Sequence, residues 1–331
     1  MSEGQPVTSA PEETAHPEAA EIEVPVVGRK DAARDPHALL TGRPPIQEYL
    51  ALAQQASGGS PSDIKALMED WRKASTHIVG LTAREAGAAD DAPIEAVAPE
   101  LVPVASDYLA DPVIARSFAF LPTEVGVVDL DKVVVYQKFI NLRYAQKIAA
   151  ILRKDLDAEA LLTFSLGLGQ ARPPVTFGLA AQNAYSFVSE STDLRLLNVA
   201  VIEPGQIDGF IAQGHAERVV AIAVGYSSNA LNVVQVNGRL ILSNGSHRAY
   251  ALRKAGFSRV PAVIQKVSHR DELDLFPAVK QQADMYLVDP RPPLLKDYFD
   301  PELHTIIELP RRLRQVRISY GVEVTEAPAV S

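Results

Sequence analysis

The sequence predicts an α+β protein with a mixed sheet and flanking helices, preceded by a disordered N-terminal tail and a small helical N-terminal region. Three observations carry this prediction. From about residue 101, short β-branched runs alternate with helical patterns. Asn237-Gly238 between two apolar runs predicts a hairpin, which continues through a glycine turn into a helix and a strand. Before residue 101, an acidic segment precedes two amphipathic patterns.

The amino-acid composition excludes several classes of protein. The chain has 331 residues, no cysteine and a net charge of −9, from 32 basic and 41 acidic side chains. Without cysteine there is no disulfide, thiolate nucleophile, Cys-ligated zinc or iron–sulfur cluster. The net negative charge disfavours a protein that binds nucleic acid over most of its surface. No apolar run approaches the ~20 residues of a membrane span, and no secretion signal opens the chain. We therefore expect a cytoplasmic protein without a membrane partner.

Four segments are expected along the chain. Residues 1–40, rich in Glu, Pro and Ala and without aromatic residues, predict a disordered acidic tail. Residues 41–100 predict a helical region and a linker, with two short helices in 43–75 and the linker over 82–100. The remaining segments are a main domain over 101–270, with an insertion near 178–225, and a C-terminal helix and strand extension over 271–331.

The elements of the main domain follow in order. Strands are expected within 125–135, from 173–177, at 231–236, 239–242 and 260–264, and helices at 144–152, 158–166 and 249–255. Residues 178–215 are ambiguous, and 218–224 fit either a strand or a helix. In the extension, 271–288 predict a helix, and 303–309 and 316–322 predict strands.

The turn after the hairpin holds the candidate site. Gly245 allows the backbone to approach a ligand, and the amides of the next three residues would lie at a helix N-terminus, which attracts anions. Arg248 adds a fork-shaped cation suited to phosphate or carboxylate. His247 can donate to a phosphate oxygen or exchange a proton near neutral pH.

A plainer interpretation of this turn is an N-cap serine, Ser246, followed by two solvated side chains. The first helical turn disfavours cationic side chains, so we favour an anion site. No second histidine or carboxylate stands at metal-ligand spacing beside this turn, and we name no metal ligand.

These residues resemble the core of the ParB/sulfiredoxin superfamily, which carries a G-x-[HR]-R turn between a strand and a helix. Here the turn is Gly245-Ser246-His247-Arg248, followed by Ala255-Gly256 and Val260-Pro261-Ala262-Val263. Upstream, 127–133 looks like the opening strand of the family, and 166–175 looks like its glycine-containing Q-P segment. The resemblance covers about residues 122–267.

The resemblance implies a nucleotide site. In this superfamily the turn binds nucleotide phosphates: CTP in ParB partition proteins, and ATP in sulfiredoxins and a free-serine kinase. By position, Gly245, Ser246, His247 and Arg248 would be the phosphate cradle, with His247 and Arg248 as candidate catalytic residues. Gly169 and Gln170 would face the same pocket, with ATP or CTP as the ligand and Mg²⁺ as a companion ion.

Two departures limit what the resemblance implies. Ser246 stands where sulfiredoxins hold their catalytic cysteine, and a hydroxyl is a far weaker nucleophile than a thiolate, so sulfinic-acid reduction is excluded. The chain also lacks the E-N-x-x-R segment of ParB partition proteins, and about sixty residues follow Val267. Partition-complex assembly is therefore not expected.

An arginine cluster lies near the C-terminus. It consists of Arg311, Arg312, Arg314 and Arg317. One interpretation is a patch for nucleic acid or an acidic partner, including the acidic tail. The interpretation that we favour slightly is an edge strand whose charges prevent self-pairing.

Three functions remain open. The first is a protein that binds a nucleotide or another phosphorylated small molecule at residues 245–248, with NTP-dependent phosphoryl transfer or hydrolysis if it is an enzyme. The second is a non-catalytic module that binds a peptide, protein or DNA through the same fold, with specificity from the insertion, the tail and the helical region. The third is a metal-dependent ParB-like nuclease, against which the acidic composition counts.

Overall fold

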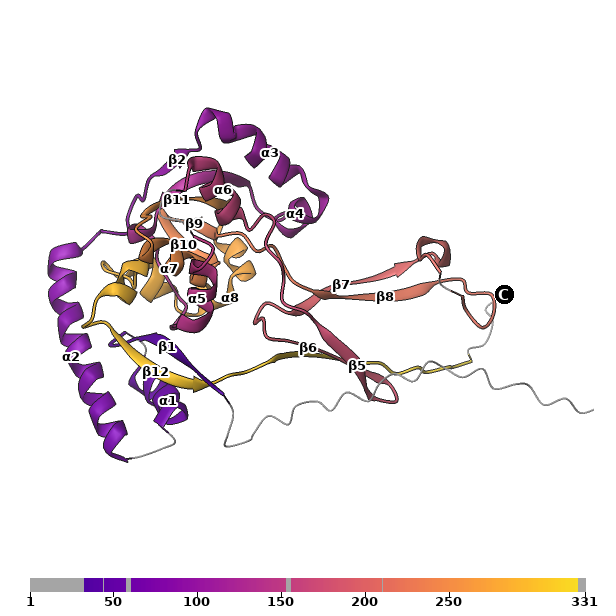
Figure 1. Cartoon of the computed structure of the whole chain (residues 1–331), viewed down its shortest axis with the longest axis horizontal. Helices are drawn as coiled ribbons and strands as arrows, with labels where there is room; N and C mark the ends of the chain where they lie inside the picture. The colour runs from indigo at the N-terminus through magenta and orange to yellow at the C-terminus, as the bar shows by residue number, and fades with distance from the viewer. Residues whose placement is uncertain (1–32, 44, 58–60, 153–155, 210, 327–331) are drawn as a thin grey trace, which may run out of the picture. The chain divides into compact units, whose positions relative to one another are not determined.

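The computed structural model describes residues 33–43, 45–57, 61–152, 156–209 and 211–326. Over these residues the chain is a mixed α+β protein, as the sequence predicts, and its strands form four sheets (Figure 1). It divides into two compact units. Among the described residues, the larger unit contains residues 33–172 and 226–312, and the smaller unit contains residues 173–225 and 313–326. The insertion expected near 178–225 falls within the smaller unit.

A five-stranded sheet forms the centre of the larger unit, in the order β10-β9-β11-β3-β2. Only β9 and β11 run parallel, because the helix after the β9–β10 hairpin returns the chain to the far side of β9. The strands are β2 (Ile94–Ala96), β3 (Thr123–Asp129), β9 (Asn232–Val236), β10 (Arg239–Asn244) and β11 (Arg259–Lys266).

Helices cover both faces of this sheet. Alternate residues of β11 point to opposite faces, so Val263 packs with Leu162 of α6 while Ala262 and Ile264 pack in the cluster that holds α5 and α7. The helices of the larger unit are α1 (Ile46–Ser57), α2 (Pro61–Glu85), α3 (Val102–Ala110), α4 (Pro112–Ser117), α5 (Leu142–Ala149), α6 (Ala158–Leu166), α7 (Ser246–Lys254) and α8 (Pro277–Gln281).

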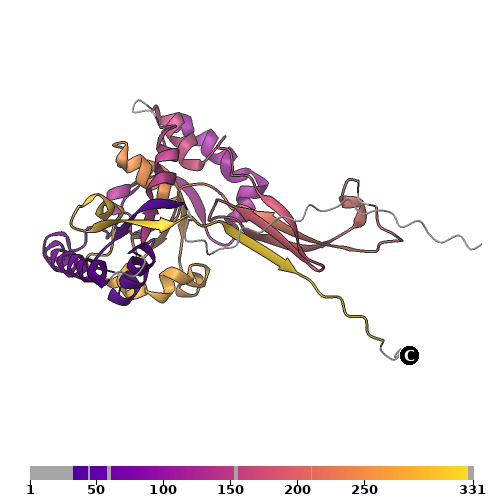
Figure 2. The same ribbon diagram turned by 60° about the horizontal axis from the view of Figure 1, so that its bottom comes forward.

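A second sheet of the larger unit corrects the predicted disordered tail. Residues 34–40 form strand β1 (Arg34–Leu40), the middle strand between β12 (His304–Pro310) and β4 (Phe139–Asn141). Local composition could not reveal this, because the partners of β1 lie a hundred residues or more away in sequence. The rest of the predicted tail, residues 1–32, lies outside the described residues. In Figure 2 the indigo helices α1 and α2 lie beside this sheet, where Trp71 packs on the cluster formed by Leu39, Tyr49, Ile307 and Leu309.

The predicted linker over 82–100 is also wrong. Helix α2 continues to Glu85, and Ile94–Ala96 pairs with β3 at the edge of the central sheet. Ala89 and Ala92 are buried, so two of the alanines that resemble linker composition are core residues here. The segment is held in place by Asp90, whose carboxylate accepts a hydrogen bond from Arg239 at 2.6 Å.

The C-terminal segment is not an appended extension as expected over 271–331. Its first strand, β12, belongs to the larger unit, and β13 (Arg314–Ser319) pairs with β6 in the smaller unit. The helix expected over 271–288 is broken into a 3-10 turn, α8 and a π turn. Pro277 explains the first break, because proline holds the preceding Phe276 out of the helical region, at φ −126° and ψ 66°.

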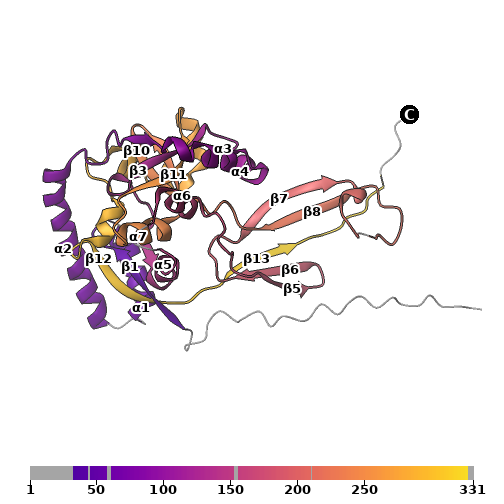
Figure 3. The ribbon, with the colours of Figure 1, turned by 45° about the horizontal axis from the view of Figure 1, so that its top comes forward.

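The smaller unit contains two separate sheets, which Figure 3 shows most clearly. One has the order β13-β6-β5, with β5 (Thr176–Ala181) and β6 (Ala184–Ser189) as a hairpin. The other is a two-stranded ribbon of β7 (Arg195–Ile202) and β8 (Val219–Gly225). Among the described residues of both units, no helix is long and apolar enough to cross a membrane.

Candidate functional site

The turn between β10 and α7 needs glycine at its centre. Gly245 has a φ of 85°, and a Cβ there would lie 3.0 Å from the Cα of Leu231 and 3.3 Å from the carbonyl oxygen of Ala230. Both are backbone atoms of the loop before β9, so they could not move aside like the end of a flexible side chain. The turn is therefore specified by glycine for a conformational and a steric reason.

Gly245 also leaves the start of α7 without a capping side chain. It is the N-cap residue, and its carbonyl accepts the first helical hydrogen bond, from the Ala249 N–H at 2.8 Å. The N–H groups of Ser246, His247 and Arg248 precede that bond in the first turn of the helix. These donors and the positive end of the helix dipole favour an anion at this position.

Arg248 is the most unusual side chain of the turn. It is 3% exposed, and its Nη2 donates to Oε1 of Gln170 at 2.7 Å. Its Nε and Nη1 are also buried, and neither has a hydrogen-bond partner in the described part of the chain. The guanidinium also lies 5.5 Å from the centre of the Phe164 ring.

Arg248 differs from an ordinary structural arginine in its pKa and in the charges around it. The pKa of Arg248 is lowered to about 10, mainly by burial and to a smaller extent by the positive charge of Arg172. Tyr144 and Tyr108 act in the opposite direction, and the charged groups that influence Arg248 include no carboxylate. At neutral pH the side chain is thus a buried cation whose charge has no anionic partner in the described residues, an arrangement that costs free energy until an anion binds.

Gln170 reaches the turn because of how α6 ends. Gly167 is the left-handed C-cap of α6, with a φ of 71°, and a Cβ there would lie 2.8 Å from the carbonyl oxygen of Asn229. The chain therefore passes close to the loop before β9, and Asn229 Nδ2 lies 3.4 Å from Gln170 Oε1. The structure thus brings Gln170 to Arg248, as expected, while no contact places Gly169 at the turn.

His247 occupies the turn but cannot exchange protons near neutral pH as expected. Its Nε2 lies 3.1 Å from the backbone nitrogen of Asn141. A backbone N–H only donates, so Nε2 must be the unprotonated acceptor and the proton of the neutral ring lies on Nδ1. Burial, together with the charge of His37, lowers the pKa of His247 to about 4. The neutral ring can donate from Nδ1 or orient a ligand, but it supplies no positive charge.

Strand β1 is linked to the turn through Asn141. Asn141, which binds His247 through its backbone, donates from its side chain to Asp35 at 3.3 Å. Asp35 is buried and also pairs with Arg143 at 3.2 Å and with Arg311 at 3.0 Å. Sequence reasoning missed both residues. Asn141 is the N-cap of α5, which its position before a helical pattern could have indicated, whereas no local signal marks Asp35.

The arginine cluster near the C-terminus is divided between the two units. Arg311 and Arg312 belong to the larger unit, and Arg314 and Arg317 belong to β13 in the smaller unit. Arg311 pairs with Asp35, and Arg314 donates to the carbonyl oxygen of Leu194 at 3.2 Å. β13 lies at the edge of its sheet, so its two arginines agree with the interpretation of a charged edge strand.

Comparison of the chain with protein-family models, with curated proteins and with solved structures found no match in any of the three. The assignment of a function to this turn therefore depends on its geometry and on the resemblance of its residues.

Proposed function

We propose that the chain binds the phosphate group of a nucleotide or another phosphorylated small molecule at Gly245–Arg248. The observation that carries this proposal is the buried guanidinium of Arg248, with two unpartnered nitrogens in the described structure and no carboxylate among the charges that act on it. Phosphate oxygens would accept from these nitrogens and from the first N–H groups of α7. The resemblance to the ParB/sulfiredoxin superfamily supports the same ligand class and makes ATP and CTP the first candidates.

The residues of the turn fit a phosphate better than a metal ion. Arg248 and the helix amides are donors, and His247 adds an Nδ1–H. The described neighbours of Arg248 offer the side-chain oxygen of Gln170, which already accepts a hydrogen bond from Arg248, and no carboxylate for Mg²⁺. Mg²⁺ would accordingly arrive bound to the phosphates of the ligand. The same lack of a carboxylate leaves no general base at the turn, so we place binding before phosphoryl transfer or hydrolysis.

Calorimetry of the full chain with ATP, CTP and GTP, each with and without Mg²⁺, tests the proposal. We expect at least one nucleotide to bind, and Arg248→Ala to weaken that binding at least ~30-fold, the equivalent of losing one buried charged hydrogen-bonding group. Lys254→Gln is the matched control, because it removes one positive charge from an exposed position on the same helix. Absence of binding by all three nucleotides, or unchanged affinity in Arg248→Ala, overturns the proposal.

A second candidate function is a non-catalytic module that binds a peptide or protein through the smaller unit. The ribbon β7–β8 favours it, because it exposes many apolar side chains that a solvated ribbon would not need. These are Leu196, Leu197, Val199, Val201, Val220 and Ile222. Capture of a partner that survives Arg248→Ala but is lost in Val199→Lys/Val201→Lys would support this function over nucleotide binding.

A further inference from the structure

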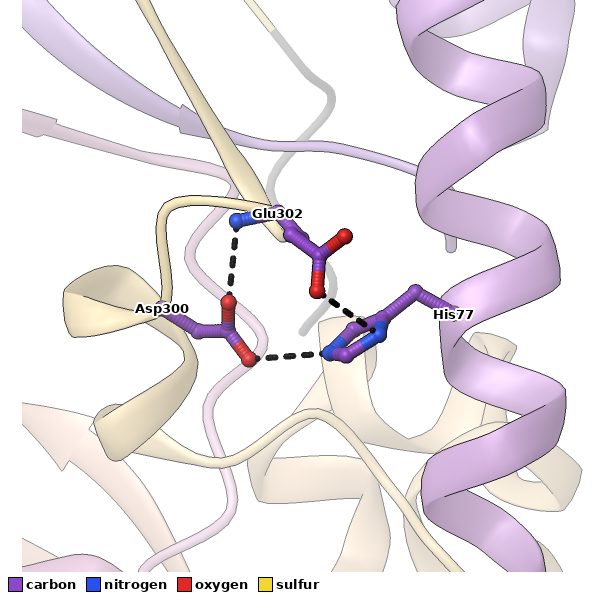
Figure 4. A group of neighbouring side chains, drawn as sticks. All are labelled: His77, Asp300 and Glu302. Carbon is purple, nitrogen blue, oxygen red and sulfur yellow. Dashed lines mark hydrogen bonds and ion pairs between the residues drawn. The ribbon is translucent and has the colours of Figure 1, made fainter.

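A cluster of metal-ligand side chains lies away from the candidate turn, and sequence spacing did not reveal it. It joins His77, in the middle of α2, to Asp300 and Glu302, in the tight turn before β12 (Figure 4). Within the described residues this is the group of histidine and carboxylate side chains whose ligand atoms come close enough for a metal ion, all within 4.8 Å of one another. His77 lies more than two hundred positions before the two carboxylates in sequence, so only the fold brings it to them.

The imidazole of His77 is placed between two carboxylates. Its Nε2 lies 3.1 Å from Oδ2 of Asp300, and its Nδ1 lies 3.1 Å from Oε2 of Glu302. A neutral imidazole carries one N–H, so it can satisfy only one of these carboxylates. With the ring neutral, the other carboxylate faces a nitrogen lone pair. The cluster is complementary to a cation that accepts electron pairs from nitrogen and oxygen together.

The turn that supplies the carboxylates is held in shape by its own hydrogen bonds. Oδ1 of Asp300 accepts from the Glu302 N–H at 2.9 Å, which leaves Oδ2 facing His77. The carbonyl of Asp300 is bound by the His304 ring at 2.8 Å. Metal-binding carboxylates are commonly oriented by such neighbouring bonds, which prevent them from turning away.

The third ligand, Glu302, is the most exposed of the three side chains. The side chain of Glu302 is 67% exposed, whereas those of His77 and Asp300 are 22% and 29% exposed. Three donors around a tetrahedral ion lie about 3.4 Å apart when each metal bond is about 2.1 Å. Glu302 faces Nδ1 of His77 while Asp300 faces Nε2, so the site requires the side chain of Glu302 to rotate towards Nε2. The cluster borders a surface depression of about 450 Å³, through which water could fill the remaining coordination position.

We propose that His77, Asp300 and Glu302 bind a divalent transition-metal ion, with Zn²⁺ as the representative, and thereby connect α2 to the turn before β12. One imidazole and two carboxylates form a donor set typical of Zn²⁺, Co²⁺ or Ni²⁺, and a nitrogen donor disfavours Ca²⁺ and Mg²⁺. Lys73 and Arg72 also line the depression and weaken the attraction for a cation, although Arg72 lies 3.7 Å from Glu69 and is partly compensated by it.

Zn²⁺ titration of the untagged, chelator-treated full chain by calorimetry tests this site. We expect one equivalent of Zn²⁺ to bind, to raise the melting temperature, and to lose affinity at least ~100-fold in both His77→Ala and Asp300→Asn. Co²⁺ substitution should produce visible d–d absorption that His77→Ala removes, a signal that reports ligation even if the variant is less stable.

His215→Ala is the matched control, because His215 also lies beside a carboxylate, Glu217 at 3.2 Å, but both side chains are almost fully exposed. It should leave stoichiometric binding unchanged. Failure of Zn²⁺ and Co²⁺ to bind would show that the cluster holds only a proton, and would overturn the proposal. Binding that persists in both His77→Ala and Asp300→Asn would place the ion elsewhere, with the same consequence. None of these outcomes depends on the Arg248 turn.

Discussion

Two buried arginines of the larger unit should respond in opposite directions to the same substitution. Arg248 and Arg291 are 3% and 1% exposed. Arg291 forms a bidentate pair with Asp297, at 2.6 and 2.7 Å, and also binds Glu85 at 3.0 Å. Arg248 has Gln170 as its hydrogen-bond partner and no carboxylate among the described charges around it. Methionine retains most of the volume of an arginine stem and removes the charge, so both sites can be tested with one change.

The expected changes in the free energy of unfolding follow from the hydrogen-bond and charge partners of each arginine. The fall in the pKa of Arg248 to about 10 corresponds to ~3 kcal/mol of cost for its buried charge. Arg248→Met relieves this cost but loses the bond to Gln170 and the contact with the Phe164 ring, together ~2 kcal/mol. We expect the ligand-free variant to be stabilised by ~1 kcal/mol. Arg291→Met leaves the buried carboxylate of Asp297 without its partner, and should cost ~3–5 kcal/mol.

Chemical and thermal denaturation of the two variants, in buffer without phosphate, measure the difference. The same experiment with added pyrophosphate should stabilise the parent chain and Arg291→Met, but not Arg248→Met. A destabilisation by Arg248→Met equal to that by Arg291→Met would refute the reasoning, because Arg248 would then have an anionic partner within the protein. Equal stabilisation of all three chains by pyrophosphate would place the anion elsewhere.

Three further changes and one titration test other parts of the structure. Gly245→Ala should destabilise the chain by ~1–3 kcal/mol in thermal melts, because of its φ of 85° and the nearby backbone of the loop before β9. Asp297→Asn should cost ~3–5 kcal/mol in urea titration, since it leaves the buried charge of Arg291 with weaker partners. The NMR titration of His247 should show a pKa of about 4 and a proton on Nδ1, and folding stability should fall as pH drops from ~6.5 towards 4, because the unfolded chain takes up that proton first. Deletion of residues 34–40 should abolish cooperative unfolding of the larger unit, because it removes the middle strand of a sheet, and a truncated chain that melts like the parent would contradict this.

Elements built from neighbouring residues were predictable from the sequence. The Asn237-Gly238 hairpin forms as expected, with both residues at positive φ. The helix expected over 158–166 is found with the same bounds, since Asp157 caps its first turn and Gly167 ends it. The glycine turn and the helix after it also follow the expected order, because each depends on backbone preferences that act within a few residues.

Contacts between distant segments were not predictable in this way. Asp35 belongs to a polar segment whose composition predicts disorder, yet its charge is balanced by Arg143 and Arg311. The predicted role of His247 was wrong for the same reason, since its tautomer depends on a backbone N–H more than a hundred residues earlier. Nothing in the sequence around His77 indicates a site, because its contact with Asp300 forms only where α2 packs beside that turn.

The amino-acid sequence by itself determined the α+β class, the hairpin, the glycine turn and the placement of Ser246, His247 and Arg248 at a helix start. These features need only local dihedral preferences, capping and hydrophobic periodicity. The tertiary structure decided the chemical state of those residues. It buried Arg248 beside Gln170, made His247 a neutral acceptor, and paired the supposed tail with two strands. Burial and charge balance depend on which segments meet in space, and that information is distributed over the whole chain.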